Sequence, residues 1–182
     1  MVRDILLSRN ASKAAGPDGV ENRLLKECAV ELAPVLLVLF RKSMDEGKVP
    51  NQWKEANIVP IHKGGLKARM SNFRPVALTS VISKVFEKII CSAIMAFLTR
   101  HSLLNQQQHG FINGRSCQTN ILLCLEKWTQ IIDDGNAVDV AYFDYAKAFD
   151  KVSHRLLLTK IKAYGIDGLL FAWLSDYLND RR

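Results

Sequence analysis

The chain has 182 residues, of which 48% are hydrophobic and 24% are charged, a composition typical of a globular domain that excludes a disordered segment. Twenty-five Lys and Arg against eighteen Asp and Glu give a formal net charge of +7, which favours a polyanionic partner such as nucleic acid. The four cysteines form no Cys-x-x-Cys pair and no apolar run is long enough for a bilayer, so we expect an intracellular protein with reduced thiols and no membrane partner.

The N-terminal region is predicted to be a loop followed by helices. Gly-Pro and Asp-Gly pairs within residues 13–20 indicate turns, and a helical run begins near Glu21. Apolar residues recur at helical spacing as far as Leu32, Pro34 fits the first turn of a second helix, and Gly47 ends that helix. We expect these helices to belong to the core and assign them no chemistry.

A basic β-hairpin is predicted next. Strands over residues 57–62 and 76–79 flank a loop that contains a Gly-Gly turn. Basic side chains crowd this segment: Lys63, Lys67, Arg69 and Arg74. The loop is either an ordinary solvated turn or a hairpin tip that approaches phosphate groups, and the residue pattern leaves both alternatives open.

Two helices are predicted on either side of a polar loop. Apolar residues at helical spacing predict an amphipathic helix over residues 80–100. Residues 106–116 are polar and interrupted by glycines, as is typical of a loop. A further helix is predicted to begin near Cys117 and to end at Gly135.

A short strand that ends in a carboxylate is predicted at residues 138–143. Val138 and Val140 alternate with other residues at the period of a β-strand, and the same alternation places Asp144 on their face. An ionised Asp at this point is costly to desolvate unless it is paired, hydrogen-bonded or bound to a cation, which favours a metal site. An Asp that caps the following turn is the alternative.

The last part of the chain is predicted to be helical. We assign Asp150 a structural role as the N-cap of a helix that begins near Lys151 and ends at Gly165. Another helix with a broad apolar face is predicted from Asp167. Long helices with a hairpin and one separate strand indicate an α+β fold rather than a doubly wound sheet.

Several of these segments resemble one enzyme family. The stretch FDYAKAFDKVSH at residues 143–154 closely resembles the first palm motif of reverse transcriptases, especially those of non-LTR (LINE-type) retrotransposons. The stretches PIHKGG and SNFRPVALTS resemble the fingers of the same enzymes, and QHGF followed by GRS resembles their template and pocket signature. The resemblance implies a partial right-hand polymerase, with residues 13–116 fingers-like, 117–182 the start of an incomplete palm, and no thumb.

The resemblance also implies roles for individual residues. Asp144 is the implied catalytic residue and ligand of Mg²⁺, or of Mn²⁺ in its place. Phe149 is implied to stack under the incoming sugar and to clash with a 2′-hydroxyl, while Lys63 and Arg74 are implied to bind the triphosphate. At the template, the implied contacts are Arg115 with a phosphate and Phe111 with a base. This chain has Ile-Asn after Phe111 where the family often has Arg-Pro.

Two functional hypotheses follow. The first is an RNA-directed DNA polymerase, a nucleotidyltransferase that uses an RNA template, a DNA primer and deoxynucleoside triphosphates. One Asp cannot hold two metal ions, and the family supplies further carboxylates from a later Tyr/Phe-x-Asp-Asp hairpin, so we expect the isolated chain to be inactive. The second hypothesis is a non-catalytic, nucleic-acid-binding remnant of a decayed retrotransposon.

Overall fold

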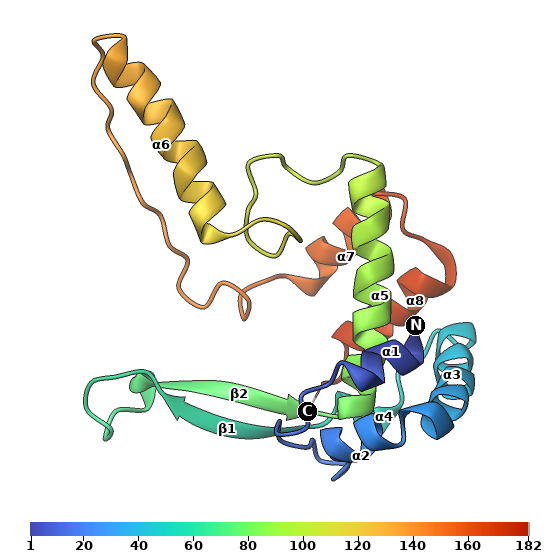
Figure 1. Cartoon of the computed structure of the whole chain (residues 1–182). Coiled ribbons are helices and arrows are strands. Elements are labelled where there is room, and N and C mark those ends of the chain that lie inside the picture. The colour runs from blue at the N-terminus through green and yellow to red at the C-terminus, as the bar shows by residue number, and fades with distance from the viewer. Residues whose placement is uncertain (182) are drawn as a thin grey trace. The chain divides into compact units, whose positions relative to one another are not determined.

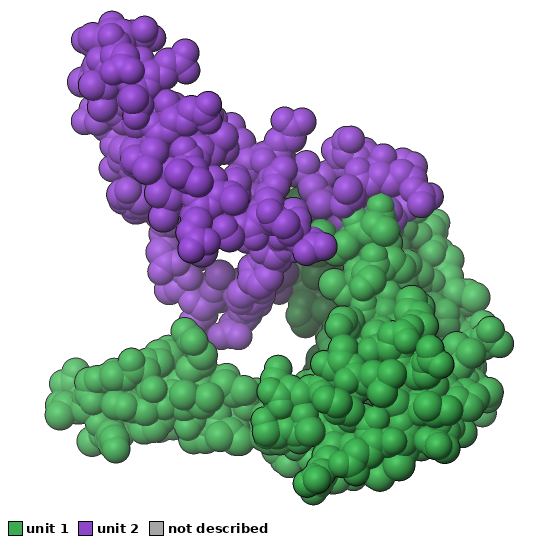
Figure 2. Space-filling view, viewed as in Figure 1, with its two compact units in different colours: residues 1–96, 153–182 green, residues 97–152 purple. Residues whose placement is uncertain are grey.

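The boundary between two structural units falls inside the long helix α5 (Val81–Arg100), in a computed structural model that describes residues 1–181. Unit 1 comprises residues 1–96 together with the chain from Ser153 onward, and unit 2 comprises residues 97–152 (Figure 2). Unit 2 is therefore an insertion between two parts of unit 1 along the sequence. Among the helices of residues 1–181, none is long and apolar enough to cross a bilayer.

The two units differ in their secondary structure (Figure 1). Besides most of α5, unit 1 contains helices α1 (Val2–Leu7), α2 (Asn22–Glu27), α3 (Ala29–Asp45), α4 (Asn51–Lys54), α7 (His154–Ala163) and α8 (Gly168–Leu178), the 3₁₀ turn η1 (Met70–Asn72), and strands β1 (Ala56–His62) and β2 (Phe73–Thr79). Unit 2 contains the end of α5, helix α6 (Cys117–Asp133) and loops.

Aromatic rings from four helices form the centre of unit 1. Phe40 of α3 stacks on Phe86 of α5 with ring centroids 4.6 Å apart, and Trp53 of α4 meets both rings edge-on. Trp173 of α8 contacts Phe86 at 5.3 Å and stacks on Tyr177, and its side chain is only 1% exposed. The broad apolar face predicted after Asp167 is therefore largely covered by the core of unit 1.

Most predicted helices are confirmed, but the break between the first two predicted helices lies at Cys28 and not next to Pro34. The chain interrupts the helix at Cys28, between α2 and α3, and Pro34 lies inside α3 rather than in its first turn. Because proline has no N–H, this position leaves one helical carbonyl near the N-terminus of α3 without its usual donor. Gly47 follows the C-cap with a φ of 60°, a left-handed conformation that glycine adopts without strain.

The predicted hairpin is confirmed and is longer than expected. Strands β1 and β2 are antiparallel, with the register running from Ala56 opposite Thr79 to His62 opposite Phe73. Strand β2 begins at residue 73 instead of 76 because its first residues pair with the end of β1. The hairpin is the one sheet among residues 1–181, and most of its side chains are exposed.

Gly16, in the predicted turn-rich loop, lies against the end of β2. A Cβ atom at this position would be 2.5 Å from the Thr79 oxygen and 2.7 Å from the Ser80 nitrogen, both backbone atoms that cannot move aside easily. Only glycine fits this approach. The loop at residues 13–20 is therefore packed on the sheet at this point, in addition to forming the expected turns.

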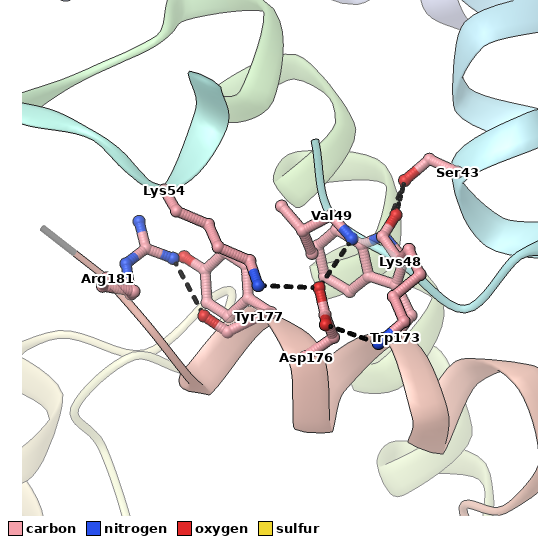
Figure 3. Close-up of polar contacts among 8 residues, drawn as sticks. All are labelled: Ser43, Lys48, Val49, Lys54, Trp173, Asp176, Tyr177 and Arg181. Carbon is pink, nitrogen blue, oxygen red and sulfur yellow. Dashed lines mark hydrogen bonds and ion pairs between the residues drawn. The ribbon is translucent and has the colours of Figure 1, made fainter. Parts of the chain in front are cut away.

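Asp176 ties α8 to the segment that follows α3 (Figure 3). Its Oδ2 accepts a hydrogen bond from the Val49 N–H at 2.8 Å and lies 2.9 Å from Lys54 Nζ, while its Oδ1 lies 3.1 Å from Lys48 Nζ. Burial acts to raise the pKa of this carboxyl, but the Val49 amide and the two ammonium groups outweigh it, so the pKa lies below its usual value. Asp176 is therefore ionised when it binds α8 to the segment after α3.

The palm strand predicted at residues 138–143 is absent from this chain, and that prediction is wrong for the described structure. The segment is extended but pairs with no strand among residues 1–181, and Asp144 at its end is exposed. A strand needs a neighbour because its N–H and C=O groups must find partners. Alternating residues mark a segment that suits a sheet, but the sheet itself is not formed here.

The N-cap role predicted for Asp150 is also wrong. Helix α7 begins at His154, three residues later than expected, and the Ser153 hydroxyl accepts a hydrogen bond from the Leu156 N–H. Serine is among the favoured N-cap residues because its oxygen satisfies a free amide of the first turn. Asp150 lies in the turn that precedes this cap and is exposed.

Candidate functional site

Lys63 and Arg74 lie on the same face of the hairpin, next to the loop that joins its strands. Arg74 pairs with Ile61, and the Lys63 N–H donates to the Asn72 carbonyl at 2.7 Å, which continues the antiparallel ladder by one pair. Alternation along each strand makes Lys63 and Arg74 diagonal neighbours on one face. Both side chains are exposed, so two positive charges point into solvent within reach of one anionic ligand.

A second group of cations lies beside the loop at residues 13–20, also within unit 1. Lys84 of α5 donates to the Thr79 carbonyl at 3.1 Å, and burial, with nearby Arg9, lowers its pKa below the usual value. Arg9 donates to Asn22 at 2.8 Å, and Asn22 in turn donates to the Lys13 carbonyl at 3.0 Å. We call Arg9, Lys13 and Lys84 the loop cations. Like charges held close together attract an anion such as phosphate.

In unit 2, Arg115 closes the polar loop that precedes α6. Its Nη1 donates to the carbonyls of Gln106 and Gln108, the second at 2.7 Å. These bonds hold one nitrogen of the guanidinium on the backbone of its own loop. Arg115 therefore shapes the loop, whatever it contacts with its remaining donors.

The start of α6 holds the same loop at a second point. Ser116 and Thr119 form a capping box in which each side chain bonds the backbone of the other residue. Thr119 Oγ1 also lies 2.8 Å from His109 Nδ1 and donates to the Ser116 carbonyl. The other ring nitrogen of His109, Nε2, is buried and has no hydrogen-bond partner among residues 1–181.

Phe111 and Phe149 contact each other within unit 2. Their ring centroids are 5.9 Å apart and the ring planes are perpendicular, the edge-to-face arrangement that aromatic pairs prefer. The side chains remain 87% and 76% exposed. Phe111 is therefore not a buried anchor of the loop, and the contact joins the loop before α6 to the turn after residue 144.

Asp144 is exposed. Within residues 1–181, no group of three His, Cys, Asp or Glu side chains is close enough together to hold a metal ion. Two-metal chemistry needs carboxylates that bridge cations about 3.5–4 Å apart. Residues 1–181 therefore do not fit a complete two-metal centre. Asp144 supplies one carboxylate, which can coordinate a cation through one or both of its oxygens.

Comparison with known proteins settles the family. The family model for reverse transcriptases (RNA-dependent DNA polymerases) matches residues 61–182, which include the end of β1, all of β2 and the segment around Asp144. The chain belongs to the reverse transcriptase family. The resemblance predicted from the sequence motifs, to the reverse transcriptases of non-LTR retrotransposons, is confirmed.

Similar curated proteins come from Drosophila melanogaster. The probable RNA-directed DNA polymerase from transposon BS is 30% identical over 171 residues, which cover 93% of this chain and 19% of that protein. The probable RNA-directed DNA polymerase from transposon X-element is 29% identical over 182 residues, 100% of this chain and 20% of that protein. The RNA-directed DNA polymerase from mobile element jockey is 25% identical, with 99% and 20% covered. This reverse transcriptase chain thus spans about a fifth of the length of these relatives.

The structure brings four of the predicted site residues together as two pairs, and Asp144 and Arg115 belong to neither pair. Lys63 and Arg74 share one face of the hairpin in unit 1, and Phe111 lies against Phe149 in unit 2. The loop cations were missed by the sequence analysis, in part because Arg9 lies far from Lys84 along the chain. The basic residues flanking the Gly-Pro-Asp-Gly turn were the available signal.

Proposed function

We propose that this chain is the fingers and early palm of an RNA-directed DNA polymerase that copies an RNA template onto a DNA primer. The observation that carries the proposal is the reverse transcriptase match over residues 61–182, which includes the Asp144 motif, Lys63 and Arg74. The similar proteins named as RNA-directed DNA polymerases give it further support. The proposed substrates are deoxynucleoside triphosphates.

Lys63 and Arg74 are proposed to hold the triphosphate of the incoming nucleotide. Negative charge builds up on the leaving pyrophosphate as the new bond to the primer forms, and fixed cations stabilise that charge. Arginine can donate two parallel hydrogen bonds to a phosphate, whereas lysine acts as a point charge. The shared face of the hairpin and the exposure of both side chains support this role.

Asp144 is proposed to bind a divalent cation, Mg²⁺ or Mn²⁺, together with carboxylates supplied from outside the described residues. Reverse transcriptases generally use divalent metal ions, which stabilise the charge of the transferred phosphoryl group when bound. The exposed carboxylate after an extended segment supports a role in which it faces a ligand. Phe149, five residues later, is proposed to exclude a 2′-hydroxyl by overlap with its ring.

Arg115 and Phe111 are proposed to contact the template. Arg115 is exposed, and the two carbonyl bonds that it makes use only Nη1, so a template phosphate has other guanidinium donors to meet. Phe111 is exposed and has a ring face on which a base can stack.

Primer extension tests the proposed activity. The chain is expressed both as the 182 residues and as the longest protein that its reading frame encodes, with a matched pair of variants. We expect Asp144→Asn to lower extension by roughly 1,000-fold or more because a lost metal ligand removes charge stabilisation worth several kcal/mol. Asp139→Asn, an exposed carboxylate in the same extended segment, should keep wild-type extension. Equal activity of the two variants would contradict the role of Asp144.

A second candidate function is nucleic-acid binding without catalysis. It is favoured by the loop cations in the well-packed unit 1 and by the lack of a metal-ligand group within residues 1–181. Binding of single-stranded RNA should then weaken steeply with salt, since each phosphate contact releases a counterion. Loss of salt-dependent binding in Lys13→Gln with Lys84→Gln, with no extension by any form of the protein, would favour this function over the polymerase.

A further inference from the structure

The contact between Phe111 and Phe149 is not explained by burial. Both rings are mostly exposed, and no residue of the segment 97–152, all of which the structure describes, is buried. The two residues lie on opposite sides of α6 along the sequence, so the contact is not a consequence of local chain geometry. An exposed aromatic pair that links two distant loops fixes one ring relative to the other.

The loop that carries Phe111 is held on several sides. Arg115 bonds to the carbonyls of Gln106 and Gln108, and His109 bonds to Thr119 in the first turn of α6. Phe111 itself has a φ of 61°, a left-handed conformation that a bulky residue keeps only where its surroundings determine it. These contacts hold the loop that carries Phe111 against the N-terminal end of α6.

The turn that carries Phe149 is held mainly by short-range bonds. Its backbone bonds are local ones, from Lys151 N–H to the Lys147 carbonyl at 3.1 Å and from Val152 N–H to the Phe149 carbonyl at 3.3 Å. Lys147 is also left-handed, with a φ of 54°. Of the two rings, Phe111 is therefore the anchored one, and Phe149 is the one whose position the contact determines.

We propose that Phe111 is a positioning residue that holds the Phe149 ring in place and thereby sharpens selection of deoxynucleotides over ribonucleotides. The proposal rests on the role of Phe149 proposed above. A ring that excludes a hydroxyl by overlap works only while it stays where the hydroxyl would be, so freedom of the ring weakens exclusion more than it weakens binding of the correct substrate. A face of Phe111 that does not meet Phe149 remains open to a template base.

The contact itself is tested by NMR on the 182-residue chain with ¹³C-labelled phenylalanine rings. We expect cross-relaxation between the ring protons of Phe111 and Phe149, assigned by the loss of signals in Phe111→Leu, and a shift of the Phe149 ring signals in that variant. Phe143→Leu, which alters an exposed ring in the extended segment before Asp144, should leave the Phe149 signals unshifted. Absence of the cross-relaxation would overturn the proposal without any need for catalysis.

The effect on selectivity is tested by primer extension with each nucleotide type, as the ratio of kcat/KM for a deoxynucleotide to that for the matching ribonucleotide. We expect Phe111→Ala to lower this ratio roughly three- to tenfold, the range set by one aromatic pair. Phe111→Tyr, which keeps the ring, should restore the wild-type ratio. In a Phe149→Ala background, Phe111→Ala should not lower the ratio any further.

The outcomes separate the two proposals. If Phe149→Ala keeps the wild-type ratio, Phe149 does not select the sugar, and the positioning role falls with it. If Phe149→Ala lowers the ratio but Phe111→Ala does not, only the positioning role is overturned. An equal loss from Phe111→Ala with and without the Phe149 ring would also overturn it, because Phe111 would then act independently.

Discussion

Units 1 and 2 are ordered by different kinds of interaction. Unit 1 has a core of aromatic and aliphatic side chains from α1, α3, α5 and α8, whereas unit 2 has no buried residue between Phe97 and Val152, a range that the structure describes in full. In unit 2 the loops are held by hydrogen bonds and by the ring contact between Phe111 and Phe149. The most specific sequence motif, around Asp144, therefore lies in the part of the chain with the least packing, where side chains are exposed to a ligand.

The comparison is tested most strongly by removing one large ring from each unit. Trp173→Ala should lower the free energy of unfolding by about 4 kcal/mol, since it leaves a cavity against Phe86 and removes the hydrogen bond to Ser43. Phe143→Ala, in unit 2, removes a ring that is 90% exposed and should change the free energy of unfolding by less than about 0.5 kcal/mol. Urea denaturation followed by circular dichroism measures both, and similar losses would mean that unit 2 also has a core.

Asp176 tests whether unit 1 depends on a buried charge as well as on its rings. Asp176→Asn should lower the free energy of unfolding by about 3 kcal/mol because it leaves Lys54 buried without its carboxylate partner. The matched control is Lys48→Gln, which removes the other ion-pair partner; its side chain is 70% exposed, and we expect a change of about 0.5 kcal/mol or less.

The stability difference between wild type and Asp176→Asn should depend on pH, and the direction follows from the pKa of Asp176. The pKa of Asp176 is lowered in the folded state, so on acidification the unfolded chain takes up the proton first. The contribution of this carboxylate is therefore fully present above about pH 5 and is lost as the pH falls from about 4 through the folded pKa. The stability difference between wild type and Asp176→Asn should shrink in this range, and a difference that grows on acidification would contradict the assignment.

Gly16 provides the smallest test and concerns the loop of unit 1 closest to the loop cations. Gly16→Ala should lower the free energy of unfolding by about 2 kcal/mol because the new methyl group meets the backbone of Thr79 and Ser80. Gly110→Ala, in unit 2, adds a methyl group where nothing lies within 4 Å and should have almost no effect. Thermal unfolding of the two variants side by side would show whether the contrast between the units extends to their loops.

The elements predicted correctly are those that a residue pattern along the chain determines. The first strand was predicted within one residue of β1, and α5, α6 and α8 were predicted from apolar spacing with caps. The strand before Asp144 was predicted wrongly because alternation reports a suitable face and not a partner strand. The N-cap was placed at Asp150 instead of Ser153 because both residue types cap helices, and the sequence does not say where the turn ends.

The candidate site was predicted as residues but not as an arrangement. The family motifs supplied Lys63, Arg74, Asp144 and Phe149, yet the ring contact of Phe149 with Phe111 joins loops separated by the whole of α6. The same holds for the bond of Asp176 to Val49, since the two residues lie more than a hundred positions apart. Contacts of this kind depend on the tertiary fold, and no periodicity along the chain encodes them.

The position of α8 has a consequence for how the protein is made. Its Trp173 and Asp176 complete the core and the ion-pair cluster of unit 1, but the ribosome delivers them only after the whole of unit 2. At typical translation rates, the interval between residues 96 and 168 lasts roughly 4–15 s. During that time the rings of Phe40 and Phe86 and the ammonium group of Lys54 lack their α8 partners. The N-terminal part of unit 1 is thus exposed to chaperones and proteases until α8 emerges.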